Sequence, residues 1–279
     1  MSRRVSARAS KKARGASSSV PPPPPSLSPP SSPPPPRDLP RPEWASRPLH
    51  KLTQFNLPFF QHDEDTTWAV EQLRLRQQLG ICAVTAPTYP HLVRLFYQNL
   101  HETPTTVGLL SNIDGQVVHI TSAMIATVLE FFAKPDYQPF PEVEDQQPIH
   151  RLIQQYFPGA HGDNSFTCLR RSKLPSRLLF LDSVVHKNVL PLGHRAERRL
   201  EFVRVLHGYH LGYQVPLEDF ILMPLQKFLR EAVRSTPLQN LTWPLPFANL
   251  LTLVFELNHL PIAEDEEIDR GYPTFGQRE

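Results

Sequence analysis

Cysteine is the scarcest residue in this sequence. Only Cys82 and Cys168 occur in the 279-residue chain. Two cysteines cannot form the disulfide framework of a small secreted domain, nor the cysteine-rich zinc knuckle of a nucleic-acid-binding module. We therefore expect a reducing compartment and a body that folds around its own hydrophobic core.

Motifs that bind nucleotides or activate nucleophiles are also missing. The sequence contains no phosphate-cradling Gly-x-x-x-x-Gly-Lys-[Ser/Thr] loop and no Gly-x-Ser-x-Gly turn, and neither cysteine has a histidine partner at a patterned spacing. ATP or GTP hydrolysis and hydrolase chemistry by a serine or cysteine nucleophile therefore have no support. We predict no catalytic, cofactor-binding or metal site.

Long apolar runs are absent as well. The most apolar stretch, residues 247–257, is interrupted by Asn249 and Glu256. It is far shorter than the roughly 20 residues of a helix that crosses a membrane, so no membrane span is expected. The first thirty residues contain no apolar segment of a secretory signal. We therefore expect that the chain is not exported by that route.

Prolines and positive charges are concentrated at the start of the chain. Residues 1–42 contain 13 of the 32 prolines and eight basic residues against one acidic residue. Such a segment cannot bury enough apolar surface to offset the entropy of ordering, and its proline runs favour an extended polyproline II spacer. We predict that residues 1–43 form a disordered, basic and proline-rich tail.

The tail carries two short basic clusters. Their members are Arg3, Arg4, Lys11, Lys12 and Arg14. This arrangement resembles a two-part nuclear import signal, and a polycation also attracts nucleic acid because binding releases counterions. The nucleus is the expected location. The alternatives are the cytoplasm, or an organelle for which this acid-free start is a transit peptide.

Apolar residues recur at helical spacing from Trp44 onward. This spacing, with its caps and its glycine and proline stops, predicts helices at residues 66–79, 90–101, 122–132, 149–157, 178–190, 196–207, 217–233 and 247–260. The pair Asp114-Gly115 between two β-branched runs predicts a hairpin. We predict a mainly α, multi-helix domain over residues 44–262 with one small β-hairpin.

Two further segments lack a helical period. Residues 135–147 are rich in proline and acid, which predicts an exposed connector and offers an alternative domain boundary inside the body. Residues 263–279 include four consecutive acids at 264–267, which predicts a solvated acidic tail.

The order of motifs in two segments of the body resembles a known family. In the first, Val-x-x-Phe-Tyr-x-Asn-Leu at residues 93–100 leads into the hairpin and the helix after it. In the second, Leu174-Pro175-Ser176-Arg177 is followed by the segment from Asn188 to Pro191, a helix, Gly-Tyr and then Ile221-Leu222. This succession is similar to the plant transposon protein domain family, found in open reading frames tied to plant retrotransposon-like elements.

The resemblance covers about residues 60–262, and it departs from the family at Leu179-Phe180, where a tryptophan is expected. The family has no established catalytic residues, so none is carried over. The resemblance implies a transposon-derived protein. Since the body shows amphipathic helices and no catalytic constellation, we predict a non-enzymatic helical interaction module that binds protein partners or itself.

A basic set in the body supports a nucleic-acid-binding alternative, together with the tail. The set comprises Arg170, Arg171, Lys173, Arg177, Arg195, Arg198 and Arg199. Glu197 and Glu201 interrupt it, and residues 43–279 hold 21 basic against 26 acidic residues. A solvated helix face is therefore favoured over a phosphate-binding surface, with nucleic acid left as a second partner class.

A metal-dependent nuclease or transposase is the third alternative. Such enzymes need separated carboxylates on a central sheet, and the body has no pattern for that sheet. The acids available are Asp114 in the hairpin turn, Asp182 in an apolar helix, and Glu218-Asp219 at a helix start. Solvated or capping roles are expected for all of them. His207 and His210, with Cys168 or His161, form an unpatterned metal set that is not favoured.

Overall fold

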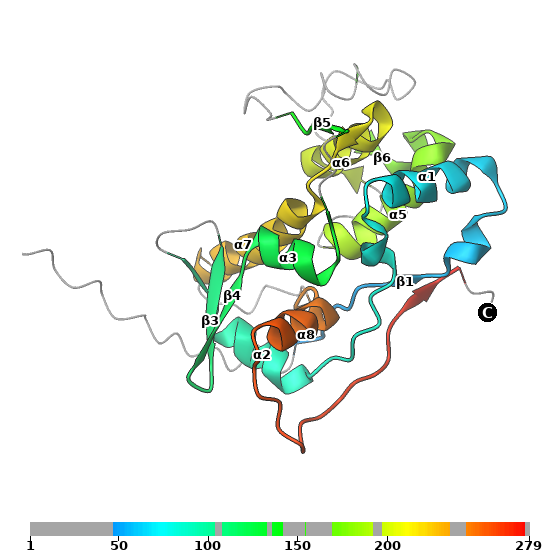
Figure 1. The fold of residues 1–279 in the computed structure, drawn as a ribbon. Helices are drawn as coiled ribbons and strands as arrows, with labels where there is room; N and C mark the ends of the chain where they lie inside the picture. Colours follow the sequence, from blue (N-terminus) through cyan, green and yellow to red (C-terminus); the bar gives the residue numbers. More distant parts are fainter. Residues whose placement is uncertain are drawn as a thin grey trace, which may run out of the picture. The chain divides into compact units, whose positions relative to one another are not determined.

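Seven α-helices provide most of the regular structure among the described residues (Figure 1). They are α1 (Glu64–Leu75), α2 (Pro90–Gln98), α3 (Ser122–Val128), α5 (Leu179–Val184), α6 (Leu200–Leu211), α7 (Leu217–Arg234) and α8 (Ala248–Leu257). The computed structural model describes residues 47–103, 108–132, 136–141, 154, 169–191, 197–234 and 244–276. The helix-rich body is confirmed. The predicted tail and almost all of the helix predicted at 149–157 lie outside the described residues.

Local chemistry sets where several helices begin and end. The Asp63 carboxylate accepts a hydrogen bond from the Thr66 amide at 2.9 Å, so α1 begins at Glu64, two residues earlier than predicted. Thr121 caps α3 in the same way through the Met124 amide. This helix ends at Val128 and not near residue 132, since Glu130 takes a left-handed conformation with φ of 55°. Gly212, with φ of 83°, ends α6.

The predicted hairpin is confirmed and is part of a larger sheet. Asp114 and Gly115, both with positive φ, connect β3 (Leu109–Ile113) to β4 (Gln116–Ile120). A third strand, β2 (His101–Glu102), pairs with β3.

Three further pairs of two-residue strands were not predicted, because each joins segments far apart in sequence. They are β1 (Gln54–Phe55) with β9 (Thr274–Phe275), β5 (Gln138–Pro139) with β8 (Tyr213–Gln214), and β6 (Leu169–Arg170) with β7 (Glu197–Arg198).

Both halves of the body share one hydrophobic core. Helix α3 packs on α7 and α8, α2 packs on α8, and α1 packs on α5. This packing joins described residues on both sides of the segment 135–147. Within that segment, β5 pairs with β8, the Arg76 guanidinium lies 4.6 Å from the centre of the Tyr137 ring, and the Phe140 ring lies against Gly208. Described residues 136–141 are thus held against the body, although most of their side chains are exposed.

Residues 269–274 are exposed, as the prediction of a solvated C-terminal tail expects, and Phe275 is half-buried, but the segment is also held against the body. Asp269 and Thr88 exchange two backbone hydrogen bonds of 2.8 and 2.9 Å. Strand β9 then runs parallel to β1, and the Phe275 ring stacks on Phe60 with a centroid distance of 5.5 Å. Pairing with a distant strand and aromatic contact hold this segment, and neither can be read from its acidic composition.

Candidate anion-binding cleft

The first wall of the site is an extended segment, residues 48–55, held by a buried asparagine. The Asn188 side-chain oxygen accepts a hydrogen bond from the Thr53 amide at 2.7 Å, and its amide nitrogen donates to the Thr53 carbonyl at 2.8 Å. The same nitrogen donates to the Ile81 carbonyl at 2.6 Å. Asn188 thus ties three distant parts of the chain together.

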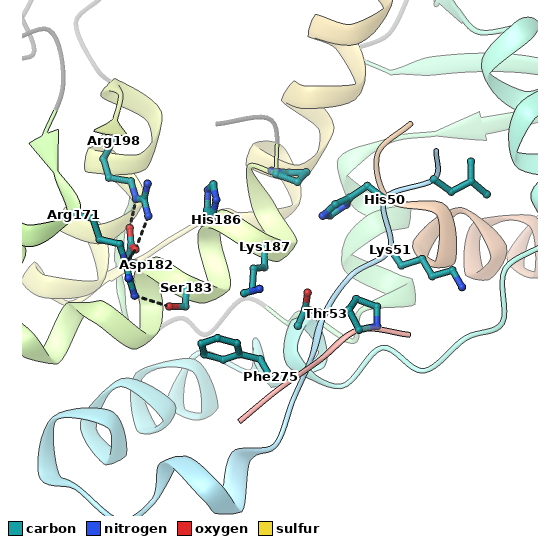
Figure 2. Close-up of a pocket in the computed structure, with 13 residues that line it drawn as sticks. His50, Lys51, Thr53, Arg171, Asp182, Ser183, His186, Lys187, Arg198 and Phe275 are labelled. Atoms are coloured by element: carbon teal, nitrogen blue, oxygen red, sulfur yellow. Dashed lines mark hydrogen bonds and ion pairs between the residues drawn. The ribbon is translucent and has the colours of Figure 1, made fainter. Parts of the chain in front are cut away.

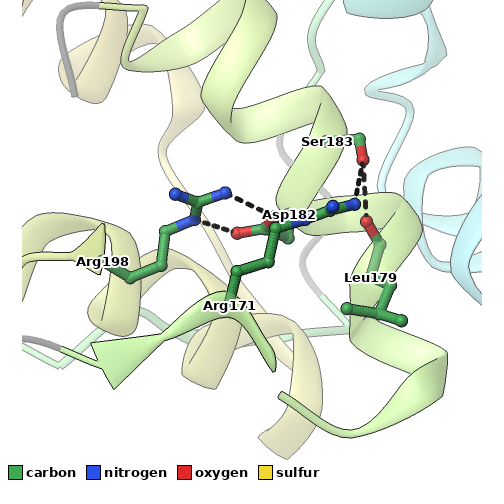
Figure 3. A network of polar contacts seen from close by, with 5 residues as sticks. All are labelled: Arg171, Leu179, Asp182, Ser183 and Arg198. Carbon is green, nitrogen blue, oxygen red and sulfur yellow. Dashed lines mark hydrogen bonds and ion pairs between the residues drawn. The ribbon is translucent and has the colours of Figure 1, made fainter. Parts of the chain in front are cut away.

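The second wall centres on a fully buried carboxylate, Asp182, in α5 (Figure 3). Arg198, whose side chain is 1% exposed, pairs with both carboxylate oxygens and has an Nη2 to Oδ2 distance of 2.7 Å. Arg171, 47% exposed, donates from Nε to Oδ2 at 2.9 Å and from Nη2 to Ser183 at 3.3 Å. Asp182 is therefore neither solvated nor a helix cap, which corrects the expectation for it.

The third wall is the C-terminal segment. The Gln54 amide donates to the Pro273 carbonyl at 2.8 Å, and the Asn56 amide donates to the Phe275 carbonyl at 3.0 Å. The Lys51 ammonium pairs with the Asp269 carboxylate and also donates to the Gly271 carbonyl. The hydrogen bond from Lys51 is the main reason that the pKa of Asp269 lies below its ordinary value.

A cavity of about 750 Å³ lies between these walls (Figure 2). We call it the basic cleft. Its lining residues are Leu49, His50, Lys51, Thr53, Arg171, Asp182, Ser183, His186, Lys187, Pro191, Arg198, Pro273 and Phe275. Its volume falls within the range of roughly 300–1,000 Å³ that is usual for small-molecule sites.

A π-helix supplies two of the lining residues. After α5 the chain continues as a π-helix over Val185–Val189, closed by a bond from the Leu190 amide to the Val185 carbonyl at 2.7 Å. His186 and Lys187 follow each other in this wide turn, and both are half-buried at the cleft. Insertions of this kind are frequent at functional sites. The Lys187 ammonium also lies 4.9 Å from the centre of the Phe275 ring.

The two cleft histidines are neutral at pH 7. Burial, with smaller contributions from His186 and Lys187, lowers the pKa of His50 to about 4. Burial and then Arg198 lower the pKa of His186 to about 4, with further lowering by Lys187 and Arg171 and an opposing effect of Asp182. The Nδ1 atom of each ring is buried and has no hydrogen-bond partner among the described residues. In the tautomer that carries its proton on Nε2, the Nδ1 atom holds only a lone pair and does not need an acceptor. This tautomer suits a buried Nδ1 without a partner, so both rings can donate a hydrogen bond from Nε2.

Cationic side chains outnumber carboxylates among the described residues at the cleft. The cations are Lys51, Arg171, Lys187 and Arg198, and the carboxylates are Asp182 in the cleft and Asp269 at its edge. Asp182 already binds two arginines, so it does not oppose an incoming anion as an isolated carboxylate would. This arrangement can hold an anion.

The structure separates the basic set that the sequence suggested. Arg171 and Arg198 meet at Asp182, but Arg198 is buried, so it belongs to no exposed helix face. Arg177 lies elsewhere, 5.2 Å from the centre of the Trp68 ring. Arg170, Lys173 and Arg199 are exposed. The remaining predicted contacts, Arg3, Arg4, Lys11, Lys12, Arg14 and Arg195, lie outside the described residues.

Among the described residues, the carboxylates and histidines considered for metal chemistry form no group that could hold a metal ion, and His161 and Cys168 lie outside the described residues. Asp114 lies in the hairpin turn, whereas Glu218 and Asp219 begin α7. His210 accepts a hydrogen bond from Arg177 at Nδ1, at 2.6 Å, which places a cation beside that ring. In the part of the chain that the structure describes, no three histidine, cysteine, aspartate or glutamate side chains lie close enough to hold a metal ion.

Four basic or histidine residues of the cleft were missed by sequence reasoning. They are His50, Lys51, His186 and Lys187. His186 and Lys187 lie inside the helix predicted at residues 178–190, whose period marks only apolar residues, and His50 and Lys51 precede the first predicted helix without a pattern. The two segments meet because the buried Asn188 bonds to Thr53, far away in the sequence. No local pattern in the sequence could indicate that contact.

We expect the protein to lose stability as the pH falls from 6.5 to 4. A histidine with a pKa of about 4 in the folded state and 6.5 when unfolded binds fewer protons when folded, so acid favours unfolding in this window. His50→Gln and His186→Gln should each reduce the loss by on the order of 1 kcal/mol, a value discounted for partial exposure. Urea unfolding at pH 7.5 and pH 5 measures this. An unchanged pH dependence in both variants would contradict the assignment.

Comparisons with known proteins do not assign a function to the cleft. No family model, curated protein or solved structure matches the chain. Among the described residues, no helix is both long and apolar enough to cross a membrane.

Proposed function

We propose that this chain is a non-enzymatic binding module of a transposon-derived protein, and that its body binds the phosphate groups of nucleic acid in the basic cleft. The observation that carries the proposal is the gathering of four cationic side chains, Lys51, Arg171, Lys187 and Arg198, in a cavity formed by three distant segments. Phosphate contacts supply most of the sequence-independent affinity for nucleic acid. The transposon origin rests on the order of motifs in residues 90–135 and 174–260.

Nucleic acid is favoured over a protein partner because the cleft is polar and charged. An obligate protein interface has an apolar centre from which charged residues are depleted. The lysines, arginines and histidines of the cleft are the groups that contact phosphate oxygens. In this proposal the basic tail adds a second, loose contact and directs the protein to the nucleus.

The proposal predicts that removing two cleft charges weakens nucleic-acid binding. In Lys51→Gln/Lys187→Gln of the full chain, affinity for a labelled single-stranded oligonucleotide should fall about tenfold at 0.1 M salt, with a shallower salt dependence. Fluorescence anisotropy across a salt series measures both quantities. The tail is unchanged in this variant, so the difference reports the cleft.

A matched variant controls for loss of charge as such. Arg74→Gln/Arg230→Gln also removes two positive charges, each from a surface ion pair, with Glu71 and with Glu102. Affinity should stay within about twofold of the unmodified chain. Equal weakening in the two double variants would reject the cleft as the binding site. If nucleic-acid binding by the unmodified chain depended on the tail alone, the cleft would also be rejected as the binding site. Protein partners would then be the next candidates for the body.

A further inference from the structure

We infer that the basic cleft takes single-stranded nucleic acid, with phosphate groups of the strand in the cleft and one base stacked on the ring of Phe59 at its rim. This inference rests on the proposed function, since it names the form of nucleic acid that the same site binds. It is carried by a cluster of phenylalanine rings that reaches from the lining of the cleft to the surface.

Phe275 joins this cluster to the cleft. Its ring lines the cavity, and the Lys187 ammonium lies 4.9 Å from the ring centre (Figure 2). The ring also stacks on Phe60, with a centroid distance of 5.5 Å and an interplanar angle of 12°. Phe275 and Phe60 are both half-buried. These contacts make Phe275 a wall of the cleft and leave the open surface of the cluster to its next member.

Phe59 is the exposed member of the cluster. Its ring meets the Phe60 ring at a centroid distance of 5.1 Å and an interplanar angle of 86°. Its Cδ1 atom lies 3.0 Å from the place that a Cβ atom on Gly276 would occupy, so Phe59 lies against the residue that follows Phe275. The side chain remains 40% exposed. A large aromatic ring is therefore open to solvent beside a cavity lined by cations.

The local backbone holds Phe59 in this position. The residue lies in a short 3-10 helix, η2 (Leu57–Phe60), in which its amide donates to the Asn56 carbonyl at 3.0 Å. The Asn56 amide in turn donates to the Phe275 carbonyl at 3.0 Å, which attaches η2 to the third wall of the cleft. A phenylalanine ring has only two side-chain torsions, so it loses little conformational entropy when a ligand covers it.

Cations next to an exposed aromatic ring match a single strand better than a duplex. Proteins that bind single strands place the backbone along positively charged side chains and stack bases on aromatic rings. In a duplex the faces of the bases already stack on their neighbours, and extruding one base costs free energy. The Phe59 ring therefore gains a base only from a strand whose bases are unpaired.

The shape of the cleft agrees with this assignment. The cavity of about 750 Å³ lies between residues 49–53, α5 with its π-helix, and residues 273–275. The phosphates of a duplex are fixed on the outside of a stiff helix. A single strand is flexible, and its bases can be splayed out, so a phosphate can enter the cavity while a neighbouring base stays at the rim.

The test measures what the Phe59 ring contributes to the binding of three probes. Fluorescence anisotropy is measured for the full chain with a labelled single-stranded DNA of about 12 nucleotides, a closed hairpin duplex of the same sequence, and an abasic strand of the same length. Phe59→Ala should weaken binding of the single strand about tenfold. Affinity for the duplex and for the abasic strand should stay within about twofold of the unmodified chain, because neither offers an unpaired base.

Three further variants separate stacking from other effects. Phe59→Trp should bind the single strand at least as tightly as the unmodified chain. Phe59→Leu keeps an apolar side chain without a ring and should be as weak as Phe59→Ala. Phe132→Ala is the matched control, since it removes a ring that is 60% exposed and lies after α3, outside the lining of the cleft. It should keep affinity within about twofold. Thermal unfolding verifies that each variant is folded.

The outcomes distinguish this inference from the proposed function. Unchanged affinity of Phe59→Ala for the single strand would overturn the inference, and so would an equal loss on the duplex or on the abasic strand. If Lys51→Gln/Lys187→Gln still weakened binding in those cases, the proposed function would stand without it. If that double variant bound every probe as the unmodified chain does, the proposed function itself would fail.

Discussion

Asp182→Ala is expected to lower the free energy of unfolding by about 3–5 kcal/mol. Asp182 is fully buried and bonds to Arg198, whose side chain is 1% exposed, and to Arg171. Without the carboxylate, the buried guanidinium of Arg198 loses its ion pair with Asp182, and the substitution also leaves a small cavity. Urea unfolding of the full chain, followed by circular dichroism, measures the change.

Two companion variants separate the charge from the space that the side chain fills. Asp182→Asn keeps the shape of the side chain and removes its charge. It should therefore show most of the decrease in unfolding free energy expected for Asp182→Ala, at least about 2 kcal/mol. Asp182→Leu with Arg198→Met replaces the buried pair by apolar groups and should recover part of the stability. Glu102→Gln, which breaks the exposed pair with Arg230, should cost less than about 1 kcal/mol. Wild-type stability in Asp182→Asn would show that Arg198 does not depend on this carboxylate.

Asn188→Ala is the second substitution with a large expected effect, about 3 kcal/mol. Its side chain makes three buried hydrogen bonds, two to Thr53 and one to Ile81. Removing it leaves the Thr53 amide and two carbonyls without these partners in the interior, and each unsatisfied group carries a desolvation penalty. The segment that bears His50 and Lys51 would also lose its attachment to the π-helix. Nucleic-acid affinity should therefore fall with stability.

Asn188→Asp and Asn99→Ala test this account. An ionised aspartate accepts from the Thr53 amide but cannot donate to the two carbonyls, so it should be at least as damaging as alanine at pH 7. Asn99 makes one exposed bond, from its side-chain nitrogen to the Asn112 carbonyl at 2.7 Å. Its replacement by alanine should cost less than about 1 kcal/mol. Equal losses for Asn99→Ala and Asn188→Ala would contradict the role of burial.

Much of the secondary structure was predictable from local patterns. The helices at α2, α6, α7 and α8 follow apolar spacing with clear stops, and the Asp114-Gly115 turn marks the hairpin. Errors concentrate at helix ends. The prediction for the first helix extends to residue 79, whereas α1 ends at Leu75 and Gln77 takes a positive φ. Such endings depend on the packing of the next segment, which the helical period does not contain.

The candidate site was predictable only in part. Arg171 and Arg198 stood out as members of a basic run, but their shared partner, Asp182, was read as solvated or capping. The burial of Arg198 depends on β7 pairing with β6 and on the approach of α5. A run of basic residues does not show which of their side chains are buried. In this chain the burial depends on a carboxylate that lies 11 residues from one arginine and 16 from the other.

The sequence by itself determined the helix-rich body, the hairpin and the lack of enzyme motifs, because these depend on residues close together in the chain. Only the tertiary structure decided that residues 49–53, the π-helix and residues 273–275 enclose one basic cleft. The physical reason is that a buried asparagine and a two-residue parallel strand pair bring these segments together, while a buried ion pair fixes Arg198 beside α5. Each of those contacts spans a separation in sequence over which no local pattern exists.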